Sequence, residues 1–279
     1  MSFYYFRANI ENMLKPITFS LSLVSFIIVL SLFISSCKKD LNEIAQDGIS
    51  QETITKISNL GFNTSDVQKT EGGYLVEGDI FLSDANLNEV PTSPLLRIAE
   101  VEQYNTFNLI TGTPRTITVS VTGTVNSGFS TAVDNAIARY NAQNLVLTFQ
   151  RVSSGGNIDI TIVNTGLYIA SAGFPSGGQP YPQIKYAKKY TTYSDGFMTT
   201  VLAHEMGHCI GFRHTDYMNR SYSCGTGGNE GQTTTGSGAV HIPGTPTGPD
   251  AASWMLACLS STTNRPFNSN DRTALNYLY

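Results

Sequence analysis

The hydrophobic and polar positions between residues 112 and 189 alternate as expected for a sheet that is covered on one face. RTITVSVTG (115–123) places an apolar side chain at every second position, which is typical of a half-buried strand. STAVDNAIARYNAQN (130–144) repeats its apolar positions every three or four residues and predicts a helix, with Ser130 as its N-cap. Four further strands are predicted at 145–152, 158–163, 168–175 and 183–189.

Two more helices are predicted after these strands. The first runs from about Asp195 to Gly211, with Ser194 or Asp195 as its cap, and the second is NSNDRTALNYLY (268–279). The order of strand, helix, four strands and helix predicts an α/β (α+β) fold for residues 111–279, in which a mixed sheet is layered against helices.

A small N-terminal region precedes this domain. Residues 37–110 begin with a polar tether, followed by the pattern of a short helix at 50–62 and of a strand or hairpin at 72–83. We therefore expect a boundary near residue 110 between this region and the larger domain.

The first residues of the chain have the pattern of an export signal. Arg7 and Lys15 precede the apolar stretch ITFSLSLVSFIIVLSLFI (17–34). Cys37 follows two serines and stands three places after Ile34, which resembles the lipobox of bacterial lipoproteins with Ile where Leu is usual.

This resemblance implies a lipoprotein signal peptide at residues 1–36 and a lipid on Cys37, the new N-terminus. A plain membrane helix is the alternative, because about eighteen apolar residues can just span a bilayer. The first interpretation predicts an exported protein whose lipid anchors it to a bacterial membrane, with a secreted protein as a further alternative.

Composition narrows the class of partner. Charged residues make up 14% of the chain and the net charge is −4, so we expect no basic surface and no nucleic-acid partner.

Three of the four histidines lie within HEMGHCIGFRH (204–214). On a helix, His204 and His208 are about 40° apart around the axis, so both imidazoles can reach one ion. His214 would lie about 15 Å further along a continuous helix, too far to share that ion. Gly211 tolerates the left-handed conformation that ends helices, and a turn there would bring the third imidazole back. The spacing predicts a zinc site formed by His204, His208 and His214.

The complete pattern HExxHxxGxxH resembles the signature of the metzincin peptidases. Within this clan the chain is most similar to the bacterial dual-action HEIGH metallopeptidases. The residues that carry the similarity are HEMGHCIGFRHTDY (204–217), HIPGTPTGPDAASWMLAC (241–258), AGFPSGGQPYPQIKY (172–186) and, more weakly, YLVEGDI (74–80). The resemblance implies a metzincin-like domain with an active-site helix, a Met-turn at Met255 and a C-terminal helix.

The site and the resemblance together imply a zinc-dependent endopeptidase. One zinc ion on three neutral imidazoles keeps a position open for water, lowers the pKa of that water and polarises the scissile carbonyl. Glu205 is expected to assist the attack of the zinc-bound water as general base. Protein or peptide substrates are expected to dock by strand addition along 168–175.

Two other classes of function remain open at this point. A catalytically idle zinc-binding or adhesion lipoprotein is the alternative, although a structural site would not need Glu205. A metallohydrolase that acts on a non-protein polymer is the third interpretation. In each case the Gly/Ser/Thr-rich loop at 225–248 is expected to form a wall of the cleft.

Four further residues bear on the site. Met206 replaces the isoleucine of the HEIGH motif, a hydrophobic exchange that we expect on the core side of the helix. Astacin-like and serralysin-like enzymes have a tyrosine two residues after the Met, where this chain has Ala257, so the oxyanion-binding residue is unassigned. Asp216 is either an orienting partner of a ligand imidazole or a surface carboxylate, and His241 is expected to be a loop or wall residue.

The cysteines are expected to form one disulfide. Thiols outside the cytoplasm that can pair usually do so, and three remain if Cys37 carries a lipid. Cys209 lies on the zinc helix and is expected to face the core, which leaves Cys224 and Cys258 as the favoured pair. Pairing of Cys209 with Cys224 is the alternative.

The region from about 38 to 110 is a candidate pro-segment that restrains the active site. It contains no cysteine, so no thiolate from this region can occupy the zinc. Asp79 could do so, although an ordinary turn residue is the favoured interpretation at this position.

Overall fold

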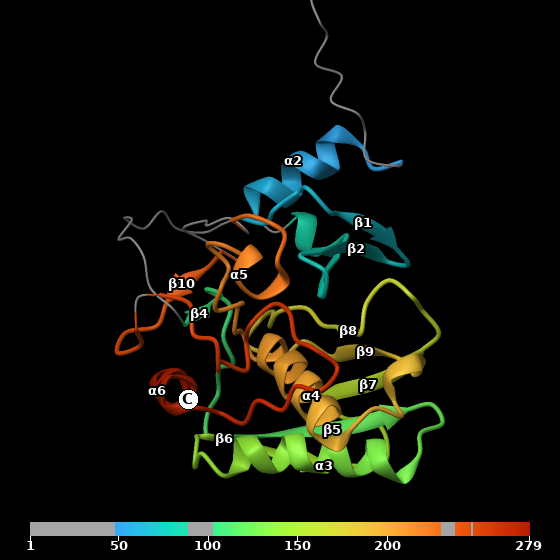
Figure 1. The fold of residues 1–279 in the computed structure, drawn as a ribbon, viewed down its shortest axis with the longest axis vertical. Coiled ribbons are helices and arrows are strands. Elements are labelled where there is room, and N and C mark those ends of the chain that lie inside the picture. Colours follow the sequence, from blue (N-terminus) through green and yellow to red (C-terminus); the bar gives the residue numbers. More distant parts are fainter. Residues whose placement is uncertain (1–47, 89–102, 230–237, 247) are drawn as a thin grey trace, which may run out of the picture. The chain divides into compact units, whose positions relative to one another are not determined.

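A five-stranded sheet is the scaffold of the computed structural model, which describes residues 48–88, 103–229, 238–246 and 248–279 (Figure 1). In spatial order its strands are β6 (Leu147–Arg151), β5 (Arg115–Thr122), β7 (Ile158–Val163), β9 (Gln183–Ala187) and β8 (Ala170–Ser171). The first four run parallel to one another, and β8 pairs antiparallel with β9 at the edge. The mixed sheet expected from the sequence is confirmed.

Two helices cover one face of this sheet. α3 (Ser127–Asn141) and α4 (Asp195–Cys209) pack against each other, α3 against β6, and α4 against β8 and β9 (Figure 1). α3 begins three residues before the predicted Ser130 because Asn126 is its N-cap, and the Asn126 side chain accepts a hydrogen bond of 2.8 Å from the backbone N–H of Phe129. Ser194 caps α4 as the sequence predicts.

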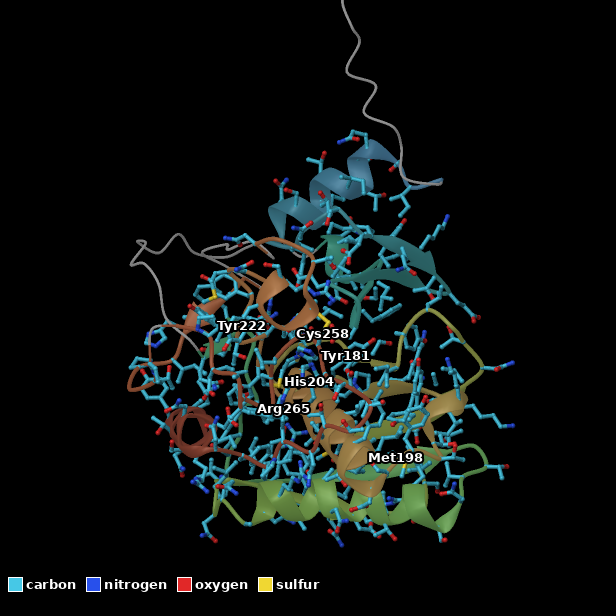
Figure 2. The ribbon with its side chains drawn as sticks, viewed as in Figure 1. Tyr181, Met198, His204, Tyr222, Cys258 and Arg265 are labelled. Carbon is cyan, nitrogen blue, oxygen red and sulfur yellow. A yellow bond between two sulfur atoms is a disulfide. The ribbon has the colours of Figure 1, made fainter. Side chains whose placement is uncertain are left out.

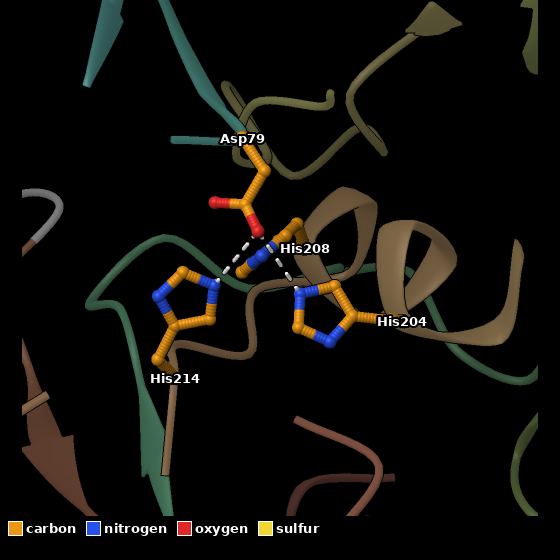
Figure 3. Close-up of side chains that lie close together, drawn as sticks. All are labelled: Asp79, His204, His208 and His214. Carbon is orange, nitrogen blue, oxygen red and sulfur yellow. Dashed lines mark hydrogen bonds and ion pairs between the residues drawn. The ribbon is translucent and has the colours of Figure 1, made fainter. Parts of the chain in front are cut away.

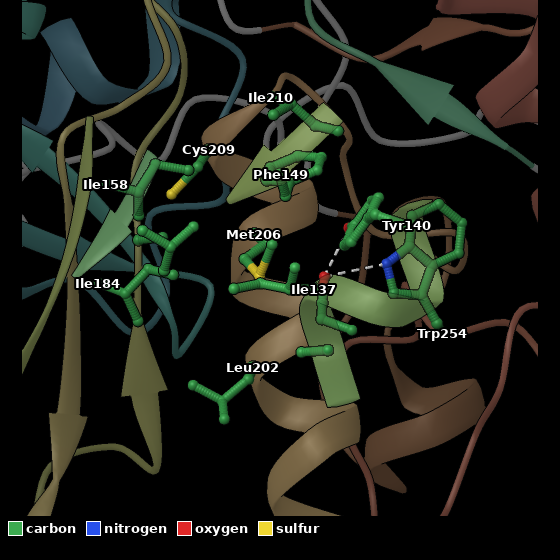
Figure 4. Packing of buried hydrophobic residues seen from close by; sticks show 14 of the residues in the cluster. Ile137, Tyr140, Phe149, Ile158, Ile184, Leu202, Met206, Cys209, Ile210 and Trp254 are labelled. Atoms are coloured by element: carbon green, nitrogen blue, oxygen red, sulfur yellow. Dashed lines mark hydrogen bonds between the residues drawn. The ribbon is translucent and has the colours of Figure 1, made fainter. Parts of the chain in front are cut away.

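α4 is buried on all sides. Every residue from Phe197 to Cys209 is buried, so the polar side chains of this helix lie in the interior together with its apolar ones. Leu202, Met206 and Cys209 belong to the cluster that includes the sheet residues Phe149, Ile158 and Ile184 (Figure 4). The expected core position of Met206 is therefore observed, and any polar group on α4 needs a partner inside the protein.

The N-terminal region contains a helix and an antiparallel meander. Its elements are α2 (Gln51–Asn59), β1 (Gln68–Thr70), β2 (Gly73–Val76), β3 (Ile80–Ser83) and the 3-10 helix η1 (Asn86–Asn88). Its apolar cluster includes Ile57, Phe62 and Leu82, and also Phe174 from the larger domain. Ala45–Tyr279 form one compact unit, and the predicted boundary near residue 110 stays a prediction.

The remaining elements surround the active-site helix. They are β4 (Tyr104–Asn105) paired with β10 (Val240–His241), η2 (Lys188–Tyr190), α5 (Ser221–Cys224) and α6 (Ser269–Leu278). A disulfide joins Cys224 to Cys258, and Cys209 is a buried free thiol (Figure 2).

The export signal lies outside the described residues. The apolar stretch 17–34 and Cys37 both fall within residues 1–47, and the loop expected at 225–248 lies partly outside as well. In the described part of the chain, no helix combines the length and the apolar character needed to cross a membrane. Lipidation of Cys37 stays a prediction from the sequence.

Candidate metal centre

Four potential metal ligands meet at the end of α4. His204, His208, His214 and Asp79 each offer one ligand atom, and these atoms all lie within 4.8 Å of one another (Figure 3). His204 and His208 lie one turn apart on α4, and His214 follows the end of the helix. The structure thus brings the three histidines together and adds a carboxylate from the N-terminal region.

A glycine turn delivers the third histidine. α4 ends at Cys209, two residues earlier than predicted, and Gly211 has the positive φ of 109° that ends helices. The backbone N–H of Phe212 donates to the carbonyl of Gly207 at 2.9 Å, which closes the turn and redirects the chain towards the helix. The break in the helix is the one that the spacing of the histidines requires.

Two of the imidazoles have a fixed tautomer. His204 Nδ1 lies 2.8 Å from the carbonyl oxygen of Trp254, and His208 Nδ1 lies 2.8 Å from that of Phe212. A carbonyl only accepts, so a proton is on Nδ1 in both rings, and in the neutral ring Nε2 carries the lone pair. Both Nε2 atoms are buried and make no hydrogen bond. Buried acceptors in this state fit a metal ion, because other buried polar atoms nearly always have a hydrogen-bond partner.

The ionisation of the site also suits metal binding. Burial lowers the pKa of His208 well below its usual value, and the charges of His204 and His214 lower it further, so the ring is neutral. Burial raises the pKa of Asp79, but the adjacent imidazoles, that of His214 foremost, outweigh this effect, so the pKa of Asp79 lies well below its usual value. Neutral imidazoles and an ionised carboxylate are the forms that bind zinc.

Asp79 occupies the position of a fourth ligand. Its Oδ2 lies 3.2 Å from His214 Nε2 and 3.5 Å from His204 Nε2 (Figure 3). Two ligands at about 2.0 Å from one tetrahedral ion are roughly 3.3 Å apart, so both distances are compatible with a shared ion. Glu77 (φ 54°) and Gly78 (φ 86°) form the tight turn between β2 and β3 that presents this side chain. Asp79 is therefore not an ordinary turn residue, and the favoured interpretation from the sequence was wrong.

The Met-turn packs against the active-site helix α4. Met255 is fully buried, and its sulfur packs so closely on Gly207 that a Cβ added there would lie 2.6 Å from it. Trp254 donates from Nε1 to the carbonyl of Ala203 at 3.3 Å, and Tyr140 donates to the same oxygen at 2.7 Å (Figure 4). The bond from Trp254 fixes the turn to α4 next to the first histidine, and the bond from Tyr140 ties α3 to the same carbonyl.

Asp216 and His241 have other roles than metal binding. Asp216 is fully buried, and its carboxylate accepts from the backbone N–H of Ala257 at 3.0 Å and from the hydroxyl of Ser223 at 2.6 Å. It therefore stabilises the chain after the Met-turn, and neither sequence interpretation of Asp216 was right. His241 Nε2 lies 3.0 Å from the hydroxyl of Thr245, and this histidine is not in the ligand group.

A cavity of about 220 Å³ opens onto the metal centre. His204 and Glu205 line it from α4, residues 168–170 from the edge of the sheet, and residues 257–259 from the segment after the Met-turn. Glu205 Oε2 is buried without a hydrogen-bond partner. Burial raises the pKa of Glu205 well above its usual value, and the negative charge of Asp79 adds to this effect.

A buried ion pair beside the centre was not foreseen from the sequence. Arg213 Nη2 lies 3.0 Å from Glu77 Oε2, and neither side chain is exposed to solvent. The Arg213 guanidinium lies 4.6 Å from the ring centroid of Phe62 and 5.8 Å from that of Phe174. The two partners are 136 residues apart in sequence, so no local pattern points to the pair.

Comparison with known proteins identifies one family. The sequence model described as dual-action HEIGH metallo-peptidase matches residues 74–279, well over half of the chain. One solved structure of myroilysin matches with a TM-score of 0.44 and 16% identity over 62% of this chain and 96% of that chain. Another matches with a TM-score of 0.31 and 19% identity over 39% of this chain, and the match spans 48%, about half, of that myroilysin chain. Comparison with curated proteins finds no significant match. The family and the group of four ligands are consistent with one zinc ion.

Proposed function

The chain belongs to the dual-action HEIGH metallo-peptidase family, and on that premise we propose that it is a zinc-dependent endopeptidase with Glu205 as its general base. One observation carries the proposal. The buried Nε2 atoms of His204 and His208 converge with His214 and Asp79, and His204 and Glu205 line one cavity. A purely structural zinc site has no use for a buried carboxylate next to an accessible cavity.

The residues of the chain have distinct tasks in this proposal. A zinc ion supplies a Lewis acid for the attacking water and the peptide carbonyl. The backbone carbonyls of Trp254 and Phe212 keep the imidazoles in the ligand tautomer. Glu205 takes a proton from the water as its oxygen bonds to the carbonyl carbon, and passes that proton to the amine nitrogen as the C–N bond breaks.

The edge of the sheet supports an extended peptide as the substrate. The backbone of Ala172, next to β8, donates to the carbonyl of Asp79 at 3.0 Å and accepts from the N–H of Phe81 at 2.8 Å. This edge therefore already binds an extended segment of chain through its backbone groups. A protein or peptide substrate can use the same groups by strand addition, whereas a non-peptide polymer has no N–H and C=O pattern to match them.

Metal removal tests the peptidase proposal. The purified protein and its Asp79→Ala variant are incubated with an unfolded protein, with and without a chelator, and their zinc content is measured. We expect about one zinc per chain and cleavage that a chelator abolishes and added zinc restores. Bound zinc without cleavage by either protein would favour an idle zinc-binding module instead.

We also propose that the N-terminal region keeps the peptidase latent. Asp79 supports this because its Oδ2 lies 3.2 Å from His214 Nε2, where it competes with water for the fourth position. The backbone bonds of Asp79 and Phe81 to Ala172 support it too, since they fill the edge on which the substrate is proposed to dock. The pro-segment hypothesis from the sequence thus gains a specific blocking residue.

Replacing Asp79 by alanine is expected to raise the rate of peptide cleavage. A hydrogen-bonded charge contributes about 1.5–3 kcal/mol, so its loss should raise the rate about tenfold or more. The affinity for a hydroxamate, which binds zinc directly, should rise in parallel. Asp84→Ala is the control, because Asp84 is an exposed carboxylate in the same region. Equal hydroxamate affinity for the wild type, Asp79→Ala and Asp79→Asn would refute latency without affecting the peptidase proposal.

A further inference from the structure

One arginine lines the cavity beside the metal centre. Among the described residues that line this cavity, Arg220 is the only lysine or arginine, and it lies there together with Glu205 and His204. Its side chain is 16% exposed, so the guanidinium is partly shielded from water but accessible. A cation in this setting interacts more strongly with a carboxylate than a fully exposed one does.

The backbone of Arg220 is tied to the wall of the cavity. Its N–H donates to the carbonyl of Gly228 at 2.9 Å, and its own carbonyl accepts from the N–H of Cys224 at 3.1 Å. Cys224 forms the disulfide with Cys258, which itself lines the cavity. The backbone of Arg220 is thus held by residues of the larger domain.

The guanidinium of Arg220 already binds a carboxylate. Its Nη1 lies 3.2 Å from Oδ2 of Asp66, a residue of the N-terminal region whose side chain is 44% exposed. Its Nη2 packs on Gly78, so closely that a Cβ added there would lie 2.5 Å away. Gly78 directly precedes Asp79, the residue on the histidines. The Arg220 guanidinium therefore contacts the residue next to Asp79, and both side chains line the same cavity as His204.

A second arginine near the metal centre is not accessible to a substrate carboxylate. Arg213 pairs with Glu77 and lies between Phe62 and Phe174, with no exposed surface. Reaching it would require the N-terminal cluster to unpack. The carboxylate of Asp66 on Arg220 is 44% exposed, so a substrate carboxylate can exchange with it.

We infer that Arg220 determines specificity, and that the enzyme prefers peptides with an aspartate or glutamate side chain within two residues of the scissile bond. The substrate carboxylate replaces Asp66 on the guanidinium, and the disulfide-linked wall sets its distance from the histidines. This inference rests on the proposed peptidase function and adds the class of substrate to it.

Matched peptides test the inference. The two peptides of each pair differ at one position within two residues of the scissile bond, on either side, where one has Glu and the other has Gln. They are given to the full chain that carries Asp79→Ala. We expect the best Glu peptide to have a kcat/KM about ten- to a hundredfold above that of its Gln partner. Arg220→Gln should bring the Glu-to-Gln ratio of kcat/KM to about one. Arg220→Lys should retain part of the preference for Glu, and Asp66→Asn should increase it.

The matched control is Arg151→Gln. Arg151 is also partly buried and lies 3.6 Å from a carboxylate, that of Asp134, but it is not part of the cavity. This variant should keep the full preference for Glu. The Tm of Arg220→Gln shows whether this variant is folded. If it is not, Arg220→Lys decides, and a Glu-to-Gln ratio of kcat/KM equal to that of the parent protein overturns the inference.

A binding measurement separates this inference from the peptidase proposal. Peptides with an N-methylated scissile amide are bound to the zinc-free protein, and the Glu and Gln forms are compared. If no variant cleaves any peptide, the peptidase proposal fails, and a binding preference that depends on Arg220 still supports the inference. An unchanged Glu-to-Gln ratio in Arg220→Gln, in binding and in cleavage, overturns it.

Discussion

Replacing Glu205 by glutamine is expected to lower kcat about 10²–10⁴-fold while the protein retains its zinc. Glutamine keeps the shape of the side chain and its place at the cavity but cannot accept a proton from water. Glu205 does not belong to the group of residues whose ligand atoms converge, so the metal should bind without it. Lost catalysis with retained metal distinguishes a general base from a ligand.

The measurement combines peptide cleavage with zinc content. In the Asp79→Ala background, His214→Ala should lose the metal as well as the activity, because His204 and His208 are then the only members of the ligand group that remain, and zinc sites have at least three protein ligands. His241→Ala should keep both, since its ring bonds to Thr245 outside the ligand group. Wild-type cleavage by Glu205→Gln would refute the proposed mechanism, and full zinc content in the double variant Asp79→Ala/His214→Ala would refute the ligand assignment.

Replacing Glu77 by glutamine is expected to lower the free energy of unfolding by about 3–5 kcal/mol. The change leaves Arg213 as a buried charge without its carboxylate, and neither side chain of this pair is exposed. The aromatic rings around the guanidinium exclude the water that could otherwise solvate it.

Thermal unfolding of the zinc-free protein measures this effect. For a domain of this size the expected loss corresponds to a decrease in Tm of about 10 °C. Glu52→Gln is the control, because Glu52 pairs with Lys56 at 2.9 Å but its side chain is 78% exposed, and we expect a change of about 0.5 kcal/mol or less. A Tm for Glu77→Gln within a degree of the wild type would contradict the buried pair. A double variant with methionine at both Glu77 and Arg213 should recover much of the loss, since it buries no charge.

The same pair links stability to latency. Glu77 lies two residues before Asp79 in the β2–β3 turn, and Arg213 directly precedes His214. The ion pair therefore joins the segment that carries Asp79 to the segment that carries His214. If latency depends on this turn, Glu77→Gln should also bind the hydroxamate more tightly.

The parts of the protein that follow from short-range patterns could be predicted from the sequence. Most strands of the larger domain and the helix α3 were recognisable because burial on one face imposes a period of about two or 3.6 residues. α4 is buried on all sides, and its cap Ser194 and its histidine motif located it instead. The convergence of His204, His208 and His214 followed from the rise of a helix and from the position of Gly211. The first residue of a helix was harder to predict where more than one nearby side chain can cap it. In α3 the N-cap is Asn126 and not the predicted Ser130.

Only the tertiary structure decided which distant residues meet at the metal centre. Asp79 reaches His214 across 135 positions in sequence, and Glu77 reaches Arg213 across 136. The sequence left two interpretations of Asp216 open. In the structure its carboxylate is buried and accepts a hydrogen bond from the backbone N–H of Ala257, 41 residues away. A carboxylate has the same local pattern whether it faces water, a metal site or an arginine, because its partner is chosen by the packing of separate elements. Spacing along the chain therefore predicted the histidines and Glu205, and the fold alone determined that Asp79 joins them.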